Sequence, residues 1–182
     1  MNPANILLLP GWQNSGPDHW QRLWEAEYGY ACIDQHDWQR PLRGDWISRL
    51  EDVLLQQKGP TVLVAHSLGC LLVAAWAAHS RNPQLVQAAL LVAPGDVERE
   101  ALRPVLTSWS PIPLQPLPFK SVLVGSRNDL FCSFERAGQF ASAWGSELVD
   151  AGSVGHLNAE SGLGKWPAGH DLLQKLINQG RH

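Results

Sequence analysis

The chain has 182 residues and a mass of 20.1 kDa, enough for one domain, because a chain of this length buries roughly 70% of its unfolded surface. Hydrophobic residues make up 45% of the sequence and charged residues 17%, a composition that argues against disorder. Fourteen Lys and Arg against 17 Asp and Glu leave a net charge of −3 with no basic run. That balance argues against nucleic acid as a partner.

Three cysteines, Cys32, Cys70 and Cys132, are too few for a disulfide scaffold. They also lack the Cys-x-x-Cys spacing of structural zinc sites, and we expect neither a metal nor an organic cofactor. The amino terminus lacks the positive start and long apolar stretch of a signal peptide. No window approaches the roughly 20 apolar residues of a membrane span. We therefore expect a cytoplasmic protein with no membrane association.

Short apolar runs alternate with helical patterns, which is typical of βα units on a mostly parallel sheet. The chain is expected to start with a strand at residues 5–9, a helix at 18–27 capped by Asp18, and a strand at 30–33. A helix at 45–57, a strand at 61–65, a helix at 68–79 and a strand at 86–92 follow. The last predicted elements are a short helix within 97–105, a strand at 121–125, a helix at 134–144, a strand at 146–149 and a helix at 170–178.

No repeat or change of composition marks a second domain, so residues 1–182 are expected to form one α/β domain. We expect strand order 2-1-3-4-5-6 with helices on both faces of the sheet. Five prolines from Pro104 to Pro118 indicate a loop that is too short for an independent helical lid. The nine tryptophans are expected to line the core and, in part, a pocket.

The segment 65–69, with the sequence AHSLG, joins a predicted strand to a predicted helix. It is close to Gly-x-Ser-x-Gly, the nucleophile elbow, in which a sharp turn lifts the serine hydroxyl above the edge of the sheet. The flanking positions must be small because the turn brings them against neighbouring backbone; Ala65 in place of glycine is a mild change. A serine here can also serve only as a helix cap. The position between strand and helix favours Ser67 as a nucleophile.

A nucleophilic serine needs a base and an orienting acid, which follow it in this fold in the order Asp or Glu, then His. Asp129 comes four residues after the fifth predicted strand, and His156 lies in the loop after the sixth. Both are expected beside Ser67, because ligands bind at the carboxyl ends of parallel strands. Asp96, after the fourth strand, is the alternative acid. A loop aspartate is also a common turn or cap residue.

Trp12 follows Pro10-Gly11 at the end of the first predicted strand. The backbone N–H groups of Trp12 and Leu68 are the expected donors to the oxyanion of an acyl-transfer reaction. The side chains of Trp12 and Trp20 either narrow the pocket or pack in the core, and both interpretations stay open. His66 is expected to point away from the Ser67 hydroxyl.

Several stretches together carry a resemblance to a known family. They are Leu9-Pro10-Gly11-Trp12, Asn14-Ser15, Asp18-His19-Trp20-Gln21, Trp24-Glu25, His66-Ser67-Leu68-Gly69, Asn128-Asp129, the run GHLNAESGLG at 155–164, and Trp166-Pro167. In these stretches the chain resembles the YdeN-like, retinoblastoma-binding protein 9-like hydrolases, and the run at 155–164 is the most specific. The resemblance implies a small α/β-hydrolase without a large lid, with Ser67, Asp129 and His156 as its triad. It also implies activity on esters or amides and, for some relatives, aminopeptidase activity.

The sequence therefore predicts a serine hydrolase that cleaves a small-molecule ester or amide through an acyl-enzyme intermediate. The alternative is a non-catalytic protein of the same fold that binds another protein through an exposed aromatic side chain. The retinoblastoma-pocket motif Leu-x-Cys-x-Glu is absent, because the segment 130–134 ends in phenylalanine. The resemblance therefore gives no basis for expecting that partner, and a protein partner stays open.

Overall fold

The computed structural model describes residues 4–179 and has one sheet of six strands, in the order β2-β1-β3-β4-β5-β6. Every neighbouring pair of strands is parallel. The strands are β1 (Asn5–Leu9), β2 (Ala31–Cys32), β3 (Thr61–His66), β4 (Val86–Val92), β5 (Lys120–Gly125) and β6 (Glu147–Asp150). The expected order is confirmed, and its direction of progression reverses between β1 and β3.

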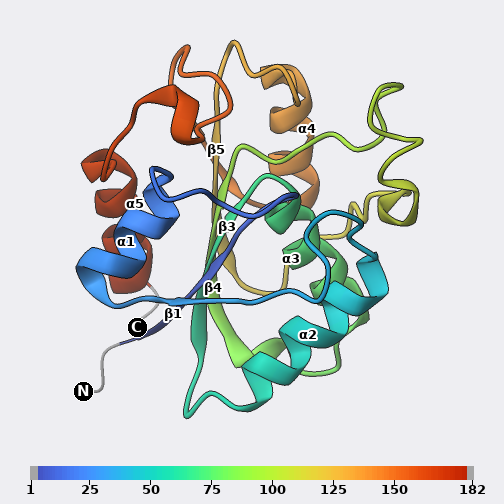
Figure 1. Cartoon of the computed structure of the whole chain (residues 1–182). Helices are drawn as coiled ribbons and strands as arrows, with labels where there is room; N and C mark the ends of the chain where they lie inside the picture. The colour runs from blue at the N-terminus through green and yellow to red at the C-terminus, as the bar shows by residue number, and fades with distance from the viewer. Residues whose placement is uncertain (1–3, 180–182) are drawn as a thin grey trace.

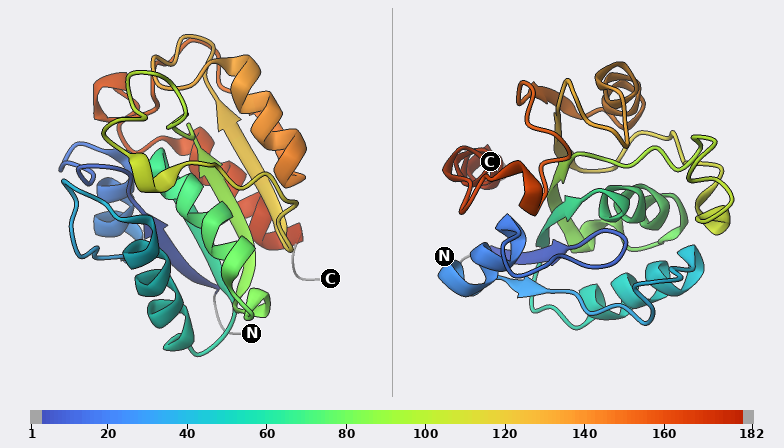
Figure 2. Two further views of the ribbon diagram at one scale, coloured as in Figure 1. Left: turned by 90° about the vertical axis from the view of Figure 1, so that its right-hand side faces the viewer. Right: turned by 45° about the horizontal axis from the view of Figure 1, so that its top comes forward.

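Helices cover both faces of this sheet (Figures 1 and 2). They are α1 (Trp20–Tyr28), α2 (Arg43–Leu55), α3 (Leu68–His79), α4 (Phe134–Trp144) and α5 (Pro167–Gln179). Helices α1 and α5 lie on one face, and α2, α3 and α4 lie on the other. Each face has its own apolar core, one around Trp24 and Leu173 and the other around Trp46 and Phe140. None of the helices within residues 4–179 is long and apolar enough to cross a membrane.

The central elements are mostly apolar because both faces of the sheet are covered there. All six residues of β3 are buried, as are residues 68–76 of α3. Helix α3 lies directly against the end of β1: a Cβ atom on Gly69 would lie 2.3 Å from the Leu9 carbonyl oxygen. A Cβ on Gly11 would lie 2.9 Å from the Ser67 Cβ. Only glycine permits these two approaches, which bring the end of β1 against the turn after β3.

The prediction of a short helix within residues 97–105 is wrong. That segment forms turns and leads into a 3₁₀ helix at Thr107–Trp109. Only two of its backbone hydrogen bonds have α-helical spacing, from Arg103 N to Arg99 O and from Leu106 N to Leu102 O, and the others have the shorter spacing of turns. Pro104 explains the interruption, because proline has no N–H and disfavours helical backbone in the residue before it.

Other boundaries shift by a few residues. Asp18 does not cap α1; the cap is His19, whose Nδ1 accepts from Gln21 N at 3.1 Å. Helix α2 begins and ends two residues earlier than expected. Helix α5 begins at Pro167 rather than at residue 170, since proline is well tolerated in the first helical turn. Strand β2 is reduced to two residues at the edge of the sheet.

The tryptophans join loops to the packed elements. Six of the nine indole N–H groups donate to backbone carbonyls outside helices and strands, in the pairs Trp12–Gln39, Trp20–Leu157, Trp24–Lys165, Trp46–Asp37, Trp109–Pro41 and Trp144–Pro113. Trp20 is buried in the core, whereas Trp12 is partly buried and borders the cavity described below. A buried indole N–H needs such a partner, so each bond fixes a loop while satisfying the indole.

The contact between α3 and β1 can be tested with Gly69→Ala. The added methyl group collides with backbone rather than with a movable side chain, so we expect the free energy of unfolding to fall by about 3 kcal/mol. The matched control is Gly138→Ala in α4, where a Cβ would make only an ordinary 3.8 Å contact with Leu148. This control should stabilise the protein by about 0.5–1 kcal/mol. Urea unfolding measures both, and equal effects would contradict the close approach.

Candidate active site

Ser67 occupies the sharp turn between β3 and α3. Its backbone has φ 54° and ψ −119°, a conformation that a residue with a Cβ adopts only under strain. The Ser67 N–H donates to the Val92 carbonyl of β4 at 3.0 Å, and the Ser67 carbonyl accepts from Cys70 N at 3.0 Å. These bonds and the neighbouring glycines fix the turn and place the hydroxyl above the carboxyl ends of the central strands.

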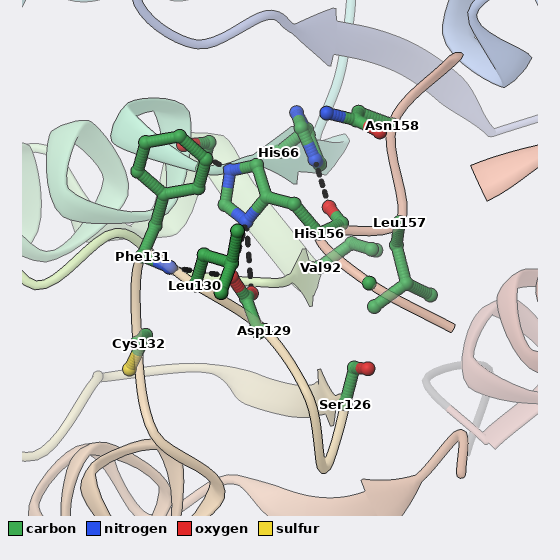
Figure 3. A network of polar contacts seen from close by, with 12 residues as sticks. His66, Val92, Ser126, Asp129, Leu130, Phe131, Cys132, His156, Leu157 and Asn158 are labelled. Carbon is green, nitrogen blue, oxygen red and sulfur yellow. Dashed lines mark hydrogen bonds and ion pairs between the residues drawn. The ribbon is translucent and has the colours of Figure 1, made fainter. Parts of the chain in front are cut away.

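Ser67, His156 and Asp129 form one chain of hydrogen bonds, although they come from three separate loops. The Ser67 Oγ lies 2.9 Å from His156 Nε2. His156 Nδ1 lies 2.8 and 3.0 Å from the two Asp129 carboxylate oxygens, as Figure 3 shows. The Asp129 side chain is 2% exposed and the His156 side chain 10%. Because a carboxylate only accepts, Nδ1 carries the proton and Nε2 is free to accept from the serine hydroxyl.

Asp96, the alternative acid, is paired elsewhere. Its Oδ2 lies 3.5 Å from Arg136 Nε, and its Oδ1 accepts from the Glu98 backbone N–H at 3.2 Å. Arg136 also binds the Glu98 carboxylate at 2.8 Å. The structure thus brings Asp129 to His156 and holds Asp96 in an ion-pair cluster between the loop after β4 and helix α4.

The loop that carries His156 is held by side chains from two other segments. Ser126 Oγ accepts from Val154 N at 3.1 Å, and Asn128 Oδ1 accepts from Gly155 N at 2.8 Å. On the other side, His66 Nε2 lies 2.9 Å from the His156 carbonyl oxygen (Figure 3). No pattern in the sequence predicts this contact of His66. Only the position of His66 directly before the serine indicates in the sequence that it lies near the site.

Ser67 and His156 open into a cavity of about 330 Å³. One wall is apolar and consists of Val97, Leu102, Leu106 and Phe131. The other wall is polar and consists of Asn14, His19, His66 and Asn158. Among the described residues, no Asp, Glu, Lys or Arg side chain lines this cavity.

The expected oxyanion donors border the same cavity. Trp12 and Leu68 both line it next to Ser67. Within residues 4–179 neither backbone N–H donates a hydrogen bond to another protein group. The loop after Trp12 has positive φ at Gln13 and Asn14, 66° and 67°, so this part of the cavity wall has an unusual backbone.

Two exposed apolar side chains, Leu130 and Phe131, directly follow Asp129, and Phe131 lines the cavity. Phe131 packs along the His156 imidazole with ring centroids 4.6 Å apart and is 40% exposed (Figure 3). Leu130, beside it, is 80% exposed. Asp129 Oδ1 accepts from Phe131 N at 2.8 Å. The backbone turn that carries these two side chains therefore also holds the carboxylate.

The comparisons with known proteins identify the family of the chain. The profile of the family described as serine hydrolase matches residues 6–175. The chain belongs to the serine hydrolase family. It is similar to the crystal structure of a YdeN-like hydrolase from Pectobacterium atrosepticum, with 30% identity, 97% of this chain and 92% of the other covered, and a TM-score of 0.86. The expected resemblance to YdeN-like hydrolases is confirmed.

More distant structures share the fold. The YdeN gene product of B. subtilis is 18% identical over 97% of this chain and all of the other, with a TM-score of 0.74. Est1E from Butyrivibrio proteoclasticus, a structure with ferulic acid bound, is 14% identical over 97% of this chain and 90% of the other, with a TM-score of 0.67. No curated protein matches the chain significantly.

Burial sets the charge state of the groups around the site of this serine hydrolase. Burial, with His156 and Arg22 nearby, lowers the pKa of His19 to about 4. Burial, with His19 and His156 nearby, holds the pKa of His66 well below its usual range. Both imidazoles are therefore neutral at pH 7. Burial also raises the pKa of the Cys132 thiol to about 12, so this thiol is not a nucleophile at neutral pH.

Proposed function

We propose that this serine hydrolase cleaves small uncharged esters, and more slowly the corresponding amides, by acyl transfer to Ser67. The observation that carries the proposal is the hydrogen-bonded chain from Ser67 Oγ through His156 to the buried Asp129 carboxylate, beside a cavity that Ser67 and His156 line. Nucleophile, base and orienting acid in this arrangement are what acyl transfer requires.

In the proposed reaction, Ser67 Oγ attacks the carbonyl carbon of the substrate while His156 Nε2 takes the hydroxyl proton. The backbone N–H groups of Trp12 and Leu68 stabilise the oxyanion, and each such donor typically contributes about 3–4 kcal/mol. His156 then protonates the leaving oxygen, and the bond to it breaks to give an acyl-Ser67 ester. A water molecule, deprotonated by His156, attacks this ester and releases the acid, with the proton returning to Ser67.

Asp129 is proposed to hold His156 in the tautomer with its proton on Nδ1 and to stabilise the imidazolium formed in each step. Its burial supports this role, because a carboxylate shielded from water interacts more strongly with the neighbouring charge. The bond from Phe131 N fixes the carboxylate orientation.

The cavity supports small, uncharged substrates. Its volume of about 330 Å³ is at the low end of the range for ligand pockets, about 300–1,000 Å³. An aminopeptidase substrate brings an α-ammonium group, which needs a carboxylate partner when desolvated. No carboxylate side chain lines the cavity in the described part of the chain, which favours esters over aminoacyl amides.

The first test is labelling by a fluorophosphonate, which reacts with an activated serine. The wild-type protein should form a single adduct, and Ser67→Ala should abolish labelling and ester hydrolysis with little change in melting temperature. A wild-type protein that is neither labelled nor hydrolytic would instead support the non-catalytic binding protein. Labelling that persists in Ser67→Ala would move the nucleophile to another residue.

The two candidate acids give a second test. Asp129→Asn removes the acceptor that fixes the His156 tautomer, and kcat should fall about 10⁴-fold, as for the equivalent change in the well-studied serine protease triad. Asp96→Asn weakens only the ion pair with Arg136, and kcat should change by less than about threefold, because Asp96 makes no hydrogen bond to Ser67 or His156 among the described residues. Hydrolysis of 4-nitrophenyl acetate measures both. The reverse ranking would refute the assignment of Asp129.

Acyl chain length gives a third test. The apolar wall is short, so kcat/KM for 4-nitrophenyl esters should be highest for acetate to butyrate and should fall for longer chains. The series from acetate to palmitate, measured below the concentration at which each ester aggregates, checks this. A maximum at the longest chains would contradict the small cavity, and activity confined to aminoacyl amides would contradict the preference for esters.

A further inference from the structure

His19 places a hydrogen-bond donor without a partner beside the cavity. Its Nδ1 accepts from Gln21 N, so in the neutral imidazole the proton must sit on Nε2. His19 is 4% exposed, and its Nε2 has no hydrogen-bond partner among the described residues. A buried donor left unpaired costs free energy, and its persistence at a cavity wall points to a ligand atom that completes it.

Two amide groups on the same wall have their oxygens occupied. Asn14 Oδ1 accepts from Ser15 N at 2.7 Å and from Arg22 Nη2 at 2.8 Å. Asn158 Oδ1 accepts from the Ser161 hydroxyl at 3.4 Å and caps the turn at Ala159–Ser161. Neither NH₂ group donates a hydrogen bond to another residue in the described part of the chain, and Figure 3 shows the Asn158 nitrogen pointing toward His66.

Both walls reach His156, the polar wall through His66 and the apolar wall through Phe131, whose ring centroid lies 4.6 Å from that of His156. The His66 ring lies 4.9 Å from the His156 ring and 4.6 Å from the His19 ring, measured between centroids. Asn158 follows His156 by two residues. In the proposed reaction His156 protonates the leaving oxygen, so the leaving group must lie on its side of the cavity. The acyl group then lies against Val97, Leu102 and Leu106.

We propose that the polar wall is a leaving-group subsite, in which His19 Nε2–H and the Asn14 and Asn158 amides bind a neutral acceptor oxygen in the alcohol part of the ester. This inference rests on the proposed function and narrows its substrates to esters of alcohols that carry an ether, hydroxyl or carbonyl oxygen near the scissile bond. Neutral donors suit a neutral oxygen, because no Lys or Arg side chain in the described chain lines the cavity to match a carboxylate.

Two pairs of esters of equal size test this subsite. 2-Methoxyethyl acetate and butyl acetate differ by one oxygen in the alcohol part, and 4-nitrophenyl methoxyacetate and butyrate differ by one oxygen in the acyl part. Each kcat/KM ratio is divided by the ratio of the hydroxide-catalysed rates, which removes intrinsic reactivity. The wild-type enzyme should prefer the ether about fivefold to tenfold in the alcohol pair, the effect of one hydrogen bond, and by less than about twofold in the acyl pair.

The variant His19→Ser isolates the donor from the helix cap. Serine is as good a cap as any residue, so it replaces the role of Nδ1 and removes Nε2–H. We expect the ether preference in the alcohol pair to fall at least threefold, whereas the acyl pair keeps its ratio. Asn158→Asp retains the oxygen that Ser161 binds and removes the NH₂ group, and it should lower the same ratio. The matched control is His79→Ser, at an exposed histidine outside the cavity, which should leave both ratios unchanged.

The outcomes separate this inference from the function on which it rests. Ester hydrolysis with no ether preference in the alcohol pair would overturn the subsite and leave the esterase intact. A preference that survives unchanged in His19→Ser and Asn158→Asp would also overturn it, since the oxygen would then be bound elsewhere. A wild-type protein without fluorophosphonate labelling or ester hydrolysis would overturn both proposals together.

Discussion

The close approach of α3 to the end of β1 is the constraint on which the site depends. With Gly69 against the Leu9 carbonyl and Gly11 against Ser67, the backbone after β1 and the turn after β3 share one small volume. That proximity places the free N–H groups of Trp12 and Leu68 at the same cavity as the Ser67 hydroxyl. A single methyl group at either glycine would separate these parts. The arrangement of the site therefore requires glycine at both positions.

The remaining parts of the site depend on hydrogen bonds between loops. His156 lies on a loop that is fixed from one side by Ser126 and Asn128 and from the other by His66. The loop after β5 therefore supplies both Asp129 and part of the frame that holds its partner histidine. Because the His66 bond is made to a backbone carbonyl, it restrains the position of His156 without competing for either of its ring nitrogens.

Much of this arrangement follows from local sequence patterns. The six strands and their order could be predicted because buried parallel strands are short apolar runs and their connections are right-handed. Ser67, Asp129 and His156 could be predicted as neighbours because each follows a strand that ends at the same edge. The helix expected within residues 97–105 does not form because Pro104 interrupts that segment.

Other features could not be read from the sequence, because they depend on tertiary contacts. Asp96 and Asp129 occupy equivalent places after their strands, and what separates them is the position of Arg136 beside Asp96. The polar wall was missed altogether. Nothing in the residue types indicates that Asn14 has its oxygen occupied by Arg22, or that His19 replaces Asp18 as the cap of α1. Which atoms of Asn14 and His19 remain free to donate depends on hydrogen-bond partners that only the folded chain brings near.

The hydrogen bonds from indole N–H groups to loop carbonyls affect how this molecule unfolds. Trp20 holds the Leu157 carbonyl, one residue after His156, from within the α1 core, and Trp109 and Trp144 hold loop carbonyls on the opposite face. Loops held in this way cannot open in small local fluctuations without exposing buried aromatic surface. Heating should therefore disrupt the site and the core in one cooperative event, and the intrinsic fluorescence of the tryptophans would report the loss of both at once.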